Sequence, residues 1–303
     1  MVGWGVPRSP DPRLALLAPH ELARLTARGE LVRLRRGTYL PAGAAAADPA
    51  ARHRQLVAAT WPLLGDGSVL SHGSAAVLHG LPVWPEQLVH VQVTRAAGRG
   101  KRRGNVHVHV APLADDEVVE VAGLRVTSPV RTVVDLGRAL PLHRAVAAGD
   151  AALRRGLDAD DLLLGLEAAA GRPGVAAARR AVALLDARSE SPWESCSRVT
   201  LHHLGLAPTS LQHEVRDAAS RLVARADFGW EEHRTLGEFD GLVKYGKLLR
   251  PGQTPSDAVV EEKRREDAVR DLDWQVVRWV RDDLRRPEEL RARILRAFRR
   301  GTR

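Results

Sequence analysis

Residues 222–243 read LVARADFGWEEHRTLGEFDGLV, and this stretch decides the fold expected for the last third of the chain. The apolar runs Leu222–Trp230 and Leu236–Val243 predict the two strands of a hairpin, joined by a polar turn at Glu231–Thr235. The elements expected around the hairpin are a helix that opens at Ser191-Pro192-Trp193-Glu194, a charged helix from Asp257 to Leu272, a strand from Trp274 to Trp279 and a basic helix from Asp282 to Arg300. This order predicts a mixed sheet flanked by helices.

Three carboxylates are placed to converge on this hairpin. Glu238 and Asp240 are two positions apart on one strand, so they point to one face, while Phe239 points to the other face, toward a core. Asp227 lies on the neighbouring strand. Carboxylates that converge repel each other unless a divalent cation lies between them, so we expect Asp227, Glu238 and Asp240 to be metal ligands. Hard oxygen ligands suit Mg²⁺ or Mn²⁺, which would polarise a phosphate and activate a water.

Two lysines and one more glutamate are candidates for a catalytic role. Lys244 and Lys263 each stand where an amine would orient the water or stabilise the developing charge. Glu194 would be a fourth acidic group, contributed by the first helix of this region. Ser191 and Glu194 also form the pattern of a capping box, with Pro192 in the first turn, and that role alone would explain Glu194. Both interpretations stay open.

The helix expected from Asp257 to Leu272 turns charge toward its own sheet. Glu261 and Arg265 fall on the same side as Ala268 and Leu272, one turn apart. A helix of this kind faces a polar site; the alternative is a helix at the domain rim with solvated charges.

The first forty residues predict two short helices and a basic hairpin. Leu14, Leu17, Leu22 and Leu25 recur at helical spacing, Pro19 interrupts the run, and two strands follow with a turn at Arg36-Gly37. Two helices and a hairpin are the outline of a winged helix-turn-helix. The residues that would contact DNA are Arg24 and Arg28 on the recognition helix and Arg33, Arg35 and Arg36 on the wing. The alternative is a helical cap whose hairpin packs on the rest of the chain.

The middle region, after an Ala-rich linker at 44–51, predicts helices and strands. Its strands are expected at 88–94, 106–110 and 124–126, and its helices at 75–79, 130–139, 142–153 and 175–187. The loop between the first two strands carries Arg99, Lys101, Arg102 and Arg103, which suit phosphate binding or a solvated hairpin tip equally. His107 and His109 share one face of a strand, near His90 on the neighbouring strand. These imidazoles either bind a metal or simply lie on an exposed face of the sheet. The second interpretation is favoured because no carboxylate is suitably spaced to complete a metal site.

Composition limits the class of protein. The chain has 303 residues, enough for two or three domains, and a net charge of +9 carried almost wholly by arginine. Arginine excess favours a polyanionic partner, although genome composition would also produce it. The single cysteine excludes an intramolecular disulfide or a cysteine-based zinc cluster and fits a reducing cytoplasm. There is no 18-residue apolar run and no signal core at 1–12, so we expect a cytoplasmic protein with no membrane partner.

The last third resembles a known family. ADFGW (226–230), GEFDGLVKY (237–245), EKRRED (262–267) and WQVVRW (274–279) are similar to an actinobacterial domain family related to the very-short-patch-repair endonucleases, within the restriction-endonuclease-like PD-(D/E)xK fold. The resemblance implies Asp227 and Glu238 as metal ligands. The family pattern has a lysine two residues after the second acid, and here Asp240 occupies that place, which leaves the catalytic lysine unassigned.

The front half resembles a second family. ELVRLRRGTY (30–39), SHGSAAVLHGLP (71–82) and TSPVRTVVDL (127–136) are similar to AbiEi-type antitoxins of type IV toxin–antitoxin systems, which are winged-helix repressors. This implies a cognate toxin as partner, and winged-helix regulators often dimerise on paired half-sites.

Together these patterns predict a multidomain α/β protein. Its expected domains are a winged helix-turn-helix at 1–45, an antitoxin-like α+β middle domain at 52–187 and a restriction-endonuclease-like domain at 189–303. Two functions follow. One is a DNA-binding protein with a magnesium-dependent endonuclease domain, in repair or phage defence, and the other is an antitoxin-like regulator whose nuclease fold is inactive or repurposed.

Overall fold

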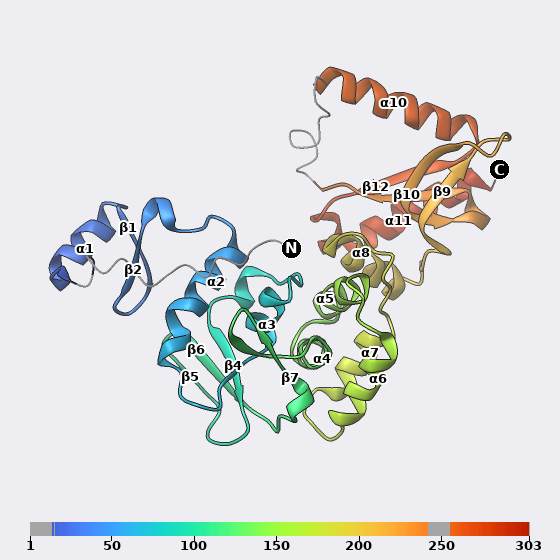
Figure 1. The fold of residues 1–303 in the computed structure, drawn as a ribbon. Coiled ribbons are helices and arrows are strands. Elements are labelled where there is room, and N and C mark those ends of the chain that lie inside the picture. Colours follow the sequence, from blue (N-terminus) through green and yellow to red (C-terminus); the bar gives the residue numbers. More distant parts are fainter. Residues whose placement is uncertain (1–13, 15, 242–254, 303) are drawn as a thin grey trace. The chain divides into compact units, whose positions relative to one another are not determined.

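The computed structural model describes residues 14, 16–241 and 255–302, and these form an α/β protein with mixed sheets (Figure 1). The expected multidomain α/β class is confirmed at this level. The contacts divide the chain into two compact units: residues 1–141 with 155–182, and residues 142–154 with 183–303. Among the described residues no helix is long and apolar enough to cross a bilayer.

Unit 1 is built on a six-stranded sheet in the order β5-β6-β4-β3-β8-β7. Its strands are β3 (Val69–Leu70), β4 (Val91–Arg95), β5 (Lys101–Arg103), β6 (Val106–Val110), β7 (Val118–Val121) and β8 (Leu124–Thr127), and β1 (Leu31–Arg35) and β2 (Thr38–Pro41) form a separate hairpin. Its helices are α1 (Pro19–Ala27), α2 (Pro49–Thr60), α3 (His72–Leu78), α4 (Pro129–Ala139), α6 (Ala159–Ala168) and α7 (Val175–Val182). β4 pairs with β6 and β3 with β8 in parallel, so the sheet is mixed.

The start of unit 1 differs in part from the expectation. The hairpin is present, with Arg35 opposite Thr38 across the Arg36-Gly37 turn. Only one α-helix precedes it among the described residues, and Pro19 begins that helix instead of separating two, because proline fits the first helical turn. Leu14 and Leu17, on which the first expected helix depended, lie in no α-helix; residues 1–13 and 15 are outside the described residues.

Two segments expected to be irregular are ordered elements. The Ala-rich linker is interrupted at Pro49, where α2 begins, and Asp48 caps it by accepting the Ala51 N–H at 2.7 Å. The loop before β6 contains the edge strand β5, which pairs antiparallel with β6. Both predictions were wrong because they relied on composition. The alanines around Asp48 predicted a linker, and the glycines and cations before β6 predicted a loop.

Unit 2 is a four-stranded sheet in the order β12-β11-β10-β9 with helices on both faces. The strands are β9 (Ser210–Arg216), β10 (Leu222–Trp230), β11 (Thr235–Phe239) and β12 (Gln275–Trp279), and the helices are α5 (Leu142–Arg154), α8 (Pro192–His203), α10 (Pro255–Asp271) and α11 (Pro287–Gly301). The hairpin β10–β11 is antiparallel and β11 pairs with β12 in parallel. The expected mixed sheet flanked by helices is therefore present, with β9 as a strand that the sequence pattern did not reveal.

Each face of this sheet has its own core. Phe228, Phe239 and Trp279 pack with α8 and α11 residues on one face, and Ala226, Leu236 and Val269 of α10 pack on the other. Phe239 thus lies in a core, as its alternation with Glu238 predicted.

Helix α5 belongs with unit 2 because of a buried carboxylate. Asp150 accepts hydrogen bonds from Arg198 Nη2 and from the Asp186 N–H, both at 2.7 Å, and its side chain is fully buried. Burial raises the pKa of Asp150, and the Arg198 charge opposes that rise. The pair joins α5 to α8 within unit 2.

The aromatic core leaves no room for a side chain at position 237. A Cβ on Gly237 would lie 2.5 Å from Trp279 and 2.9 Å from Trp230, whereas one on Gly241 would meet nothing within 4 Å. We expect Gly237→Ala to destabilise unit 2 by about 1–3 kcal/mol through overpacking, measured by denaturant unfolding. Gly241→Ala, in the same motif, is the control and should change stability by less than about 0.5 kcal/mol; equal effects of the two would contradict the packing argument.

Candidate nucleic-acid interface and a polar row

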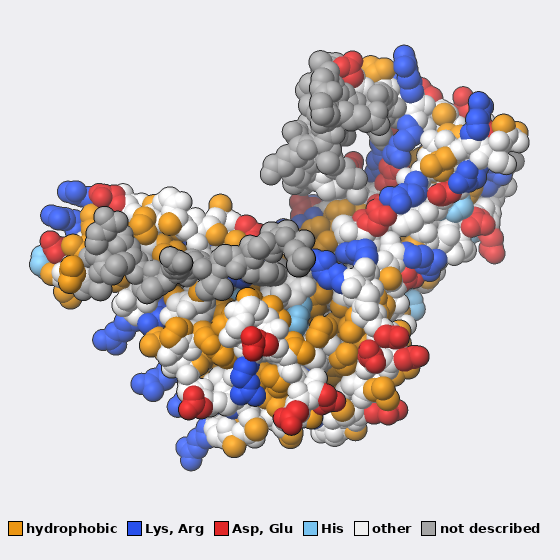
Figure 2. All heavy atoms as spheres, in the orientation of Figure 1, with side chains coloured by type: hydrophobic (Ala, Val, Ile, Leu, Met, Phe, Trp, Pro, Cys, Tyr) orange, Lys and Arg blue, Asp and Glu red, His pale blue; other side chains and the backbone are white. Residues whose placement is uncertain are grey.

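Eight of the nine cations predicted to contact nucleic acid are exposed on unit 1. Arg24, Arg28, Arg33, Arg36, Arg99, Lys101, Arg102 and Arg103 are all exposed, and Arg35 is half-buried. Figure 2 shows Lys and Arg side chains along the margin of unit 1, near α1 and near the β5–β6 end of the sheet. Arg28 follows the last residue of α1, so it lies at the end of that helix and not within it.

A hydrogen bond joins the two basic hairpins of unit 1. Asn105, in the β5–β6 turn, donates from Nδ2 to the Leu34 carbonyl of β1 at 3.0 Å, across 71 positions of sequence. Arg35 donates from Nε to the Ala59 carbonyl of α2 at 2.9 Å, and Leu34 packs on the core of the sheet. The β1–β2 hairpin is therefore fixed to α2, to the core of the sheet and to the β5–β6 turn.

The histidines of the sheet form a stack. The rings of His72 and His109 lie 3.7 Å apart at 15°, and those of His107 and His109 lie 4.0 Å apart. The face is partly covered by α3, which carries His72, so it is less exposed than expected. Among the described residues no three His, Cys, Asp or Glu side chains are placed to hold a metal ion.

Burial keeps this stack neutral. Desolvation lowers the pKa of His72 to about 4 and that of His109 to about 3. Neighbouring cations and imidazoles add to this lowering, while the charge of Asp135 opposes it at His72. Burial also lowers the pKa of His107.

In unit 2, four polar residues lie at one level across all four strands, and we call them the polar row: Gln212, Asp227, Glu238 and Arg278. Glu238 is paired directly with Arg278. Asp227 and Glu238 are one step beyond the pair Phe228–Gly237, and on β9 Gln212 stands between the residues that pair with Phe228 and Ala226. Asp227 and Glu238 therefore lie on neighbouring strands just past the last ladder pair, where Asp227 Oδ2 accepts the N–H of Phe239, the residue after Glu238.

Both oxygens of Glu238 are held by guanidinium groups. Arg265 Nη2 of α10 lies 2.7 Å from Oε1, and Arg278 Nε lies 2.8 Å from Oε2. Arg265 therefore turns its charge toward the sheet, as the helix pattern predicted; the side chain of Glu261 lies outside the described residues. The Arg278 contact had no sequence signal, because it depends on parallel pairing of strands about forty residues apart.

The other two acids make contacts with the backbone of the neighbouring strands. Asp227 Oδ2 accepts the Phe239 N–H at 2.7 Å. Asp240 follows β11, and its N–H still donates to the Trp279 carbonyl at 2.8 Å, so the strand pairing continues to it.

Glu194 has the contacts of a structural residue. Ser191 caps α8 by accepting the Glu194 N–H, as predicted, and Glu194 Oε2 accepts from the Glu190 N–H at 2.8 Å and from Gln212 Nε2 at 3.0 Å. Gln212 has a left-handed backbone, with φ of 52°, and the sequence gives no sign of its role. These bonds connect Glu194 to the polar row through Gln212.

The lysine candidates do not complete the site. Lys263 is exposed on α10, and Lys244 lies outside the described residues.

Two neighbouring carboxylates are part of a donor set for Mg²⁺ or Mn²⁺. However, two cations already occupy Glu238, and the described residues contain no group of three metal-ligating side chains. As arranged, Asp227, Glu238 and Asp240 do not fit a resident divalent cation, and the metal site stays a prediction.

The motifs of the front half have structural partners. Arg131 of α4, nearly fully buried, bonds to Asp135 at 2.9 Å and to Glu117 at 2.6 Å. Ser128 caps the same helix. The lone Cys196 is buried, and burial raises the pKa of its thiol to about 12, so it is not a nucleophile near neutral pH.

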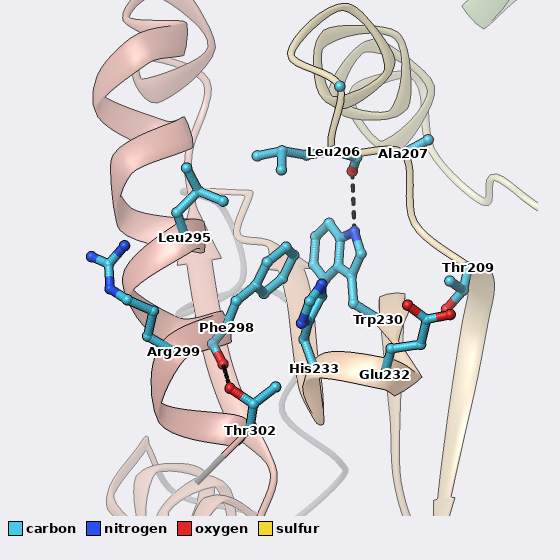
Figure 3. A pocket seen from close by; sticks show the side chains of 11 residues that line it. Leu206, Ala207, Thr209, Trp230, Glu232, His233, Leu295, Phe298, Arg299 and Thr302 are labelled. Carbon is cyan, nitrogen blue, oxygen red and sulfur yellow. Dashed lines mark hydrogen bonds between the residues drawn. The ribbon is translucent and has the colours of Figure 1, made fainter.

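A pocket of about 460 Å³ lies on the α11 side of the unit 2 sheet. Phe298 stacks on His233 at 3.9 Å, and Trp230 donates from Nε1 to the Leu206 carbonyl (Figure 3). Glu238 reaches α10 on the opposite face, so this pocket is separate from the Glu238 clamp.

Comparison with known proteins shows the family of the chain. It is 30% identical over 270 residues to the uncharacterized protein MT2308 of Mycobacterium tuberculosis strain CDC 1551 / Oshkosh, covering 88% of this chain and 92% of that protein. The same values hold for the uncharacterized protein Rv2248 of Mycobacterium tuberculosis strain ATCC 25618 / H37Rv. The chain belongs to the family of these mycobacterial proteins. No protein-family model matches it.

The histidine stack predicts a pH dependence of stability. Because the folded-state pKa values of His72 and His109 are below the ordinary 6.5, the unfolded chain binds more protons below pH 6.5. We expect the stability of unit 1 to fall as pH drops from 6.5 toward 4, by up to about 1.4 kcal/mol per pH unit for each buried imidazole. Urea unfolding of wild type and His109→Gln at several pH values would measure this.

The variant should reduce the slope, and His203→Gln, at an exposed position of unit 2, should leave it unchanged. Identical slopes for wild type and His109→Gln would show that the stack does not carry the dependence.

Proposed function

We propose that the chain is a cytoplasmic DNA-binding protein whose first unit contacts the duplex backbone through its two basic hairpins. The observation that supports this most directly is the Asn105–Leu34 bond, which anchors β1 of the first basic hairpin to the turn of the second. In this proposal α1, β1 and β2 act as a winged helix-turn-helix, the fold that the front half resembles.

The chemistry of the contacts follows from the residue types. Arginine forks match phosphate oxygens and stay charged at any physiological pH. Contacts of this kind position a protein on DNA and give binding that weakens as salt rises, because counterions are released. As in the antitoxin-like proteins, a cognate toxin and a second copy of the chain would be further partners.

We expect Arg33→Ala/Arg36→Ala to weaken duplex binding at low salt. The slope of log affinity against log salt should fall by about 2, because two phosphate contacts are lost. Fluorescence anisotropy in EDTA over a salt series measures both quantities.

Arg285→Ala/Arg286→Ala removes the same charge from exposed positions of unit 2 and is the control. Equal losses in the two variants would mean that the hairpin makes no specific contribution.

A second candidate function is a metal-dependent endonuclease in unit 2, acting in repair or phage defence. It is favoured by the antiparallel hairpin that carries Asp227 and Glu238 on neighbouring strands, and the arginines on Glu238 weigh against it. The other interpretation, a restriction-endonuclease-like domain with a repurposed site, fits those arginines.

The endonuclease proposal predicts cleavage of plasmid or mismatched duplex with Mg²⁺ or Mn²⁺ but not with EDTA. In Asp227→Ala/Glu238→Ala, cleavage should fall more than about 100-fold, since the acids would supply several kcal/mol to the reaction. DNA binding retained by the variant would show that it is folded. Cleavage that survives in the variant, or no cleavage by wild type on these substrates, would reject the candidate.

A further inference from the structure

We propose that the pocket on the α11 side of the unit 2 sheet binds a free amino acid with an aromatic side chain. Such a ligand carries one positive and one negative group on an apolar body, and the pocket offers a partner for each of these three parts. The site is separate from Glu238, and it does not depend on the proposed DNA binding.

The floor of the pocket is apolar and largely aromatic. Trp230 meets Phe298 edge-on, with ring centroids 5.5 Å apart at 62°, and Phe298 stacks on His233 at 3.9 Å (Figure 3). Leu206 and Leu295 also line it, and its volume of about 460 Å³ suits a small molecule. An aromatic ring would extend the edge-to-face and stacked contacts that these side chains already make, so we expect the apolar body of the ligand to be a ring.

Two opposite charges border the pocket without pairing. Glu232, in the turn after β10, and Arg299 of α11 both line the pocket and are exposed. Among residues 14, 16–241 and 255–302, neither side chain forms an ion pair with the other or with a third residue. In Figure 3 they lie on either side of the rings of His233 and Phe298. Arg299 offers a fork for a carboxylate and Glu232 offers an acceptor for an ammonium, so the pair suits a zwitterion.

A buried nitrogen beside the pocket has no partner. His233 Nδ1 is buried, and no group in the described part of the chain forms a hydrogen bond with it. An unpaired buried polar atom carries an energetic cost, and a hydrogen bond with a ligand in the pocket would remove that cost. An imidazole nitrogen either donates to a carboxylate or accepts from an ammonium, so both charged groups of an amino acid are suitable partners.

The test is isothermal titration calorimetry of the full chain with five probes. L-tryptophan has the ring and both charges, tryptamine lacks the carboxylate, indole-3-propionate lacks the ammonium, N-acetyl-L-tryptophanamide lacks both charges, and L-alanine lacks the ring. We expect L-tryptophan to bind at least about tenfold tighter than each of the other four, because each lacks a group that the pocket contacts.

Two variants separate the two charges. Glu232→Gln should weaken L-tryptophan and tryptamine about tenfold without weakening indole-3-propionate, and Arg299→Gln should weaken L-tryptophan and indole-3-propionate without weakening tryptamine. The controls are Glu288→Gln and Arg300→Gln, at exposed positions of α11 outside the pocket, and both should bind every probe as wild type does. A variant that only disturbed the fold would weaken all probes together.

The proposal is overturned if L-tryptophan shows no saturable binding, if N-acetyl-L-tryptophanamide binds as tightly, or if the two variants change all probes alike. His233→Phe keeps a ring against Phe298 and removes Nδ1, and it should also weaken L-tryptophan; unchanged binding would remove His233 from the site. These titrations contain no DNA, so their outcome is separate from that of the duplex-binding test.

Discussion

The parallel pairing of β11 with β12 sets Glu238 directly opposite Arg278, and the chemistry of unit 2 depends on that register. Side chains alternate between faces, so a slip of one residue would move Glu238 into the aromatic cluster and Phe239 out of it. Phe239 packs with Phe228 and Trp279 in that cluster. The hydrophobic effect thus fixes the register, and the register fixes which charged groups meet on the face of α10.

Asp227 and Glu238 are half-buried carboxylates, so each needs hydrogen-bond donors or a positive charge to compensate for lost hydration. Asp227 obtains a backbone N–H and Glu238 obtains two guanidinium groups, one from a helix and one from a strand. Losing one partner of such an ion pair costs more than the pair itself contributes, because the remaining charge stays desolvated. Arginine therefore holds the place that a divalent cation would need, and this distinguishes the described arrangement from an open metal site.

Local patterns predicted what local forces determine. The strand Leu222–Trp230 and the opposite directions of Glu238 and Phe239 follow from two-residue alternation, and Ser191 as a helix cap follows from its short-range bonding. Contacts set by tertiary pairing were not predictable. The Arg278 clamp requires parallel register, Gln212 requires a left-handed backbone on a strand with weak alternation, and Asp150 joins α5 to a helix forty residues later. The start of α2 was missed for a different reason. Asp48 and Pro49 are a helix-start signal, but they lie in an alanine-rich segment whose composition predicted a linker.

The family relation bears on both units together. The stretch shared with the mycobacterial proteins covers 270 residues, more than either unit contains, so the relation includes parts of both units. An exposed basic surface has the charge to bind any polyanion. Glu238, in contrast, is already paired with Arg265 and Arg278. Because a shared fold and shared ancestry do not by themselves fix an activity, the proposed role of each unit is tested through the side chains of that unit.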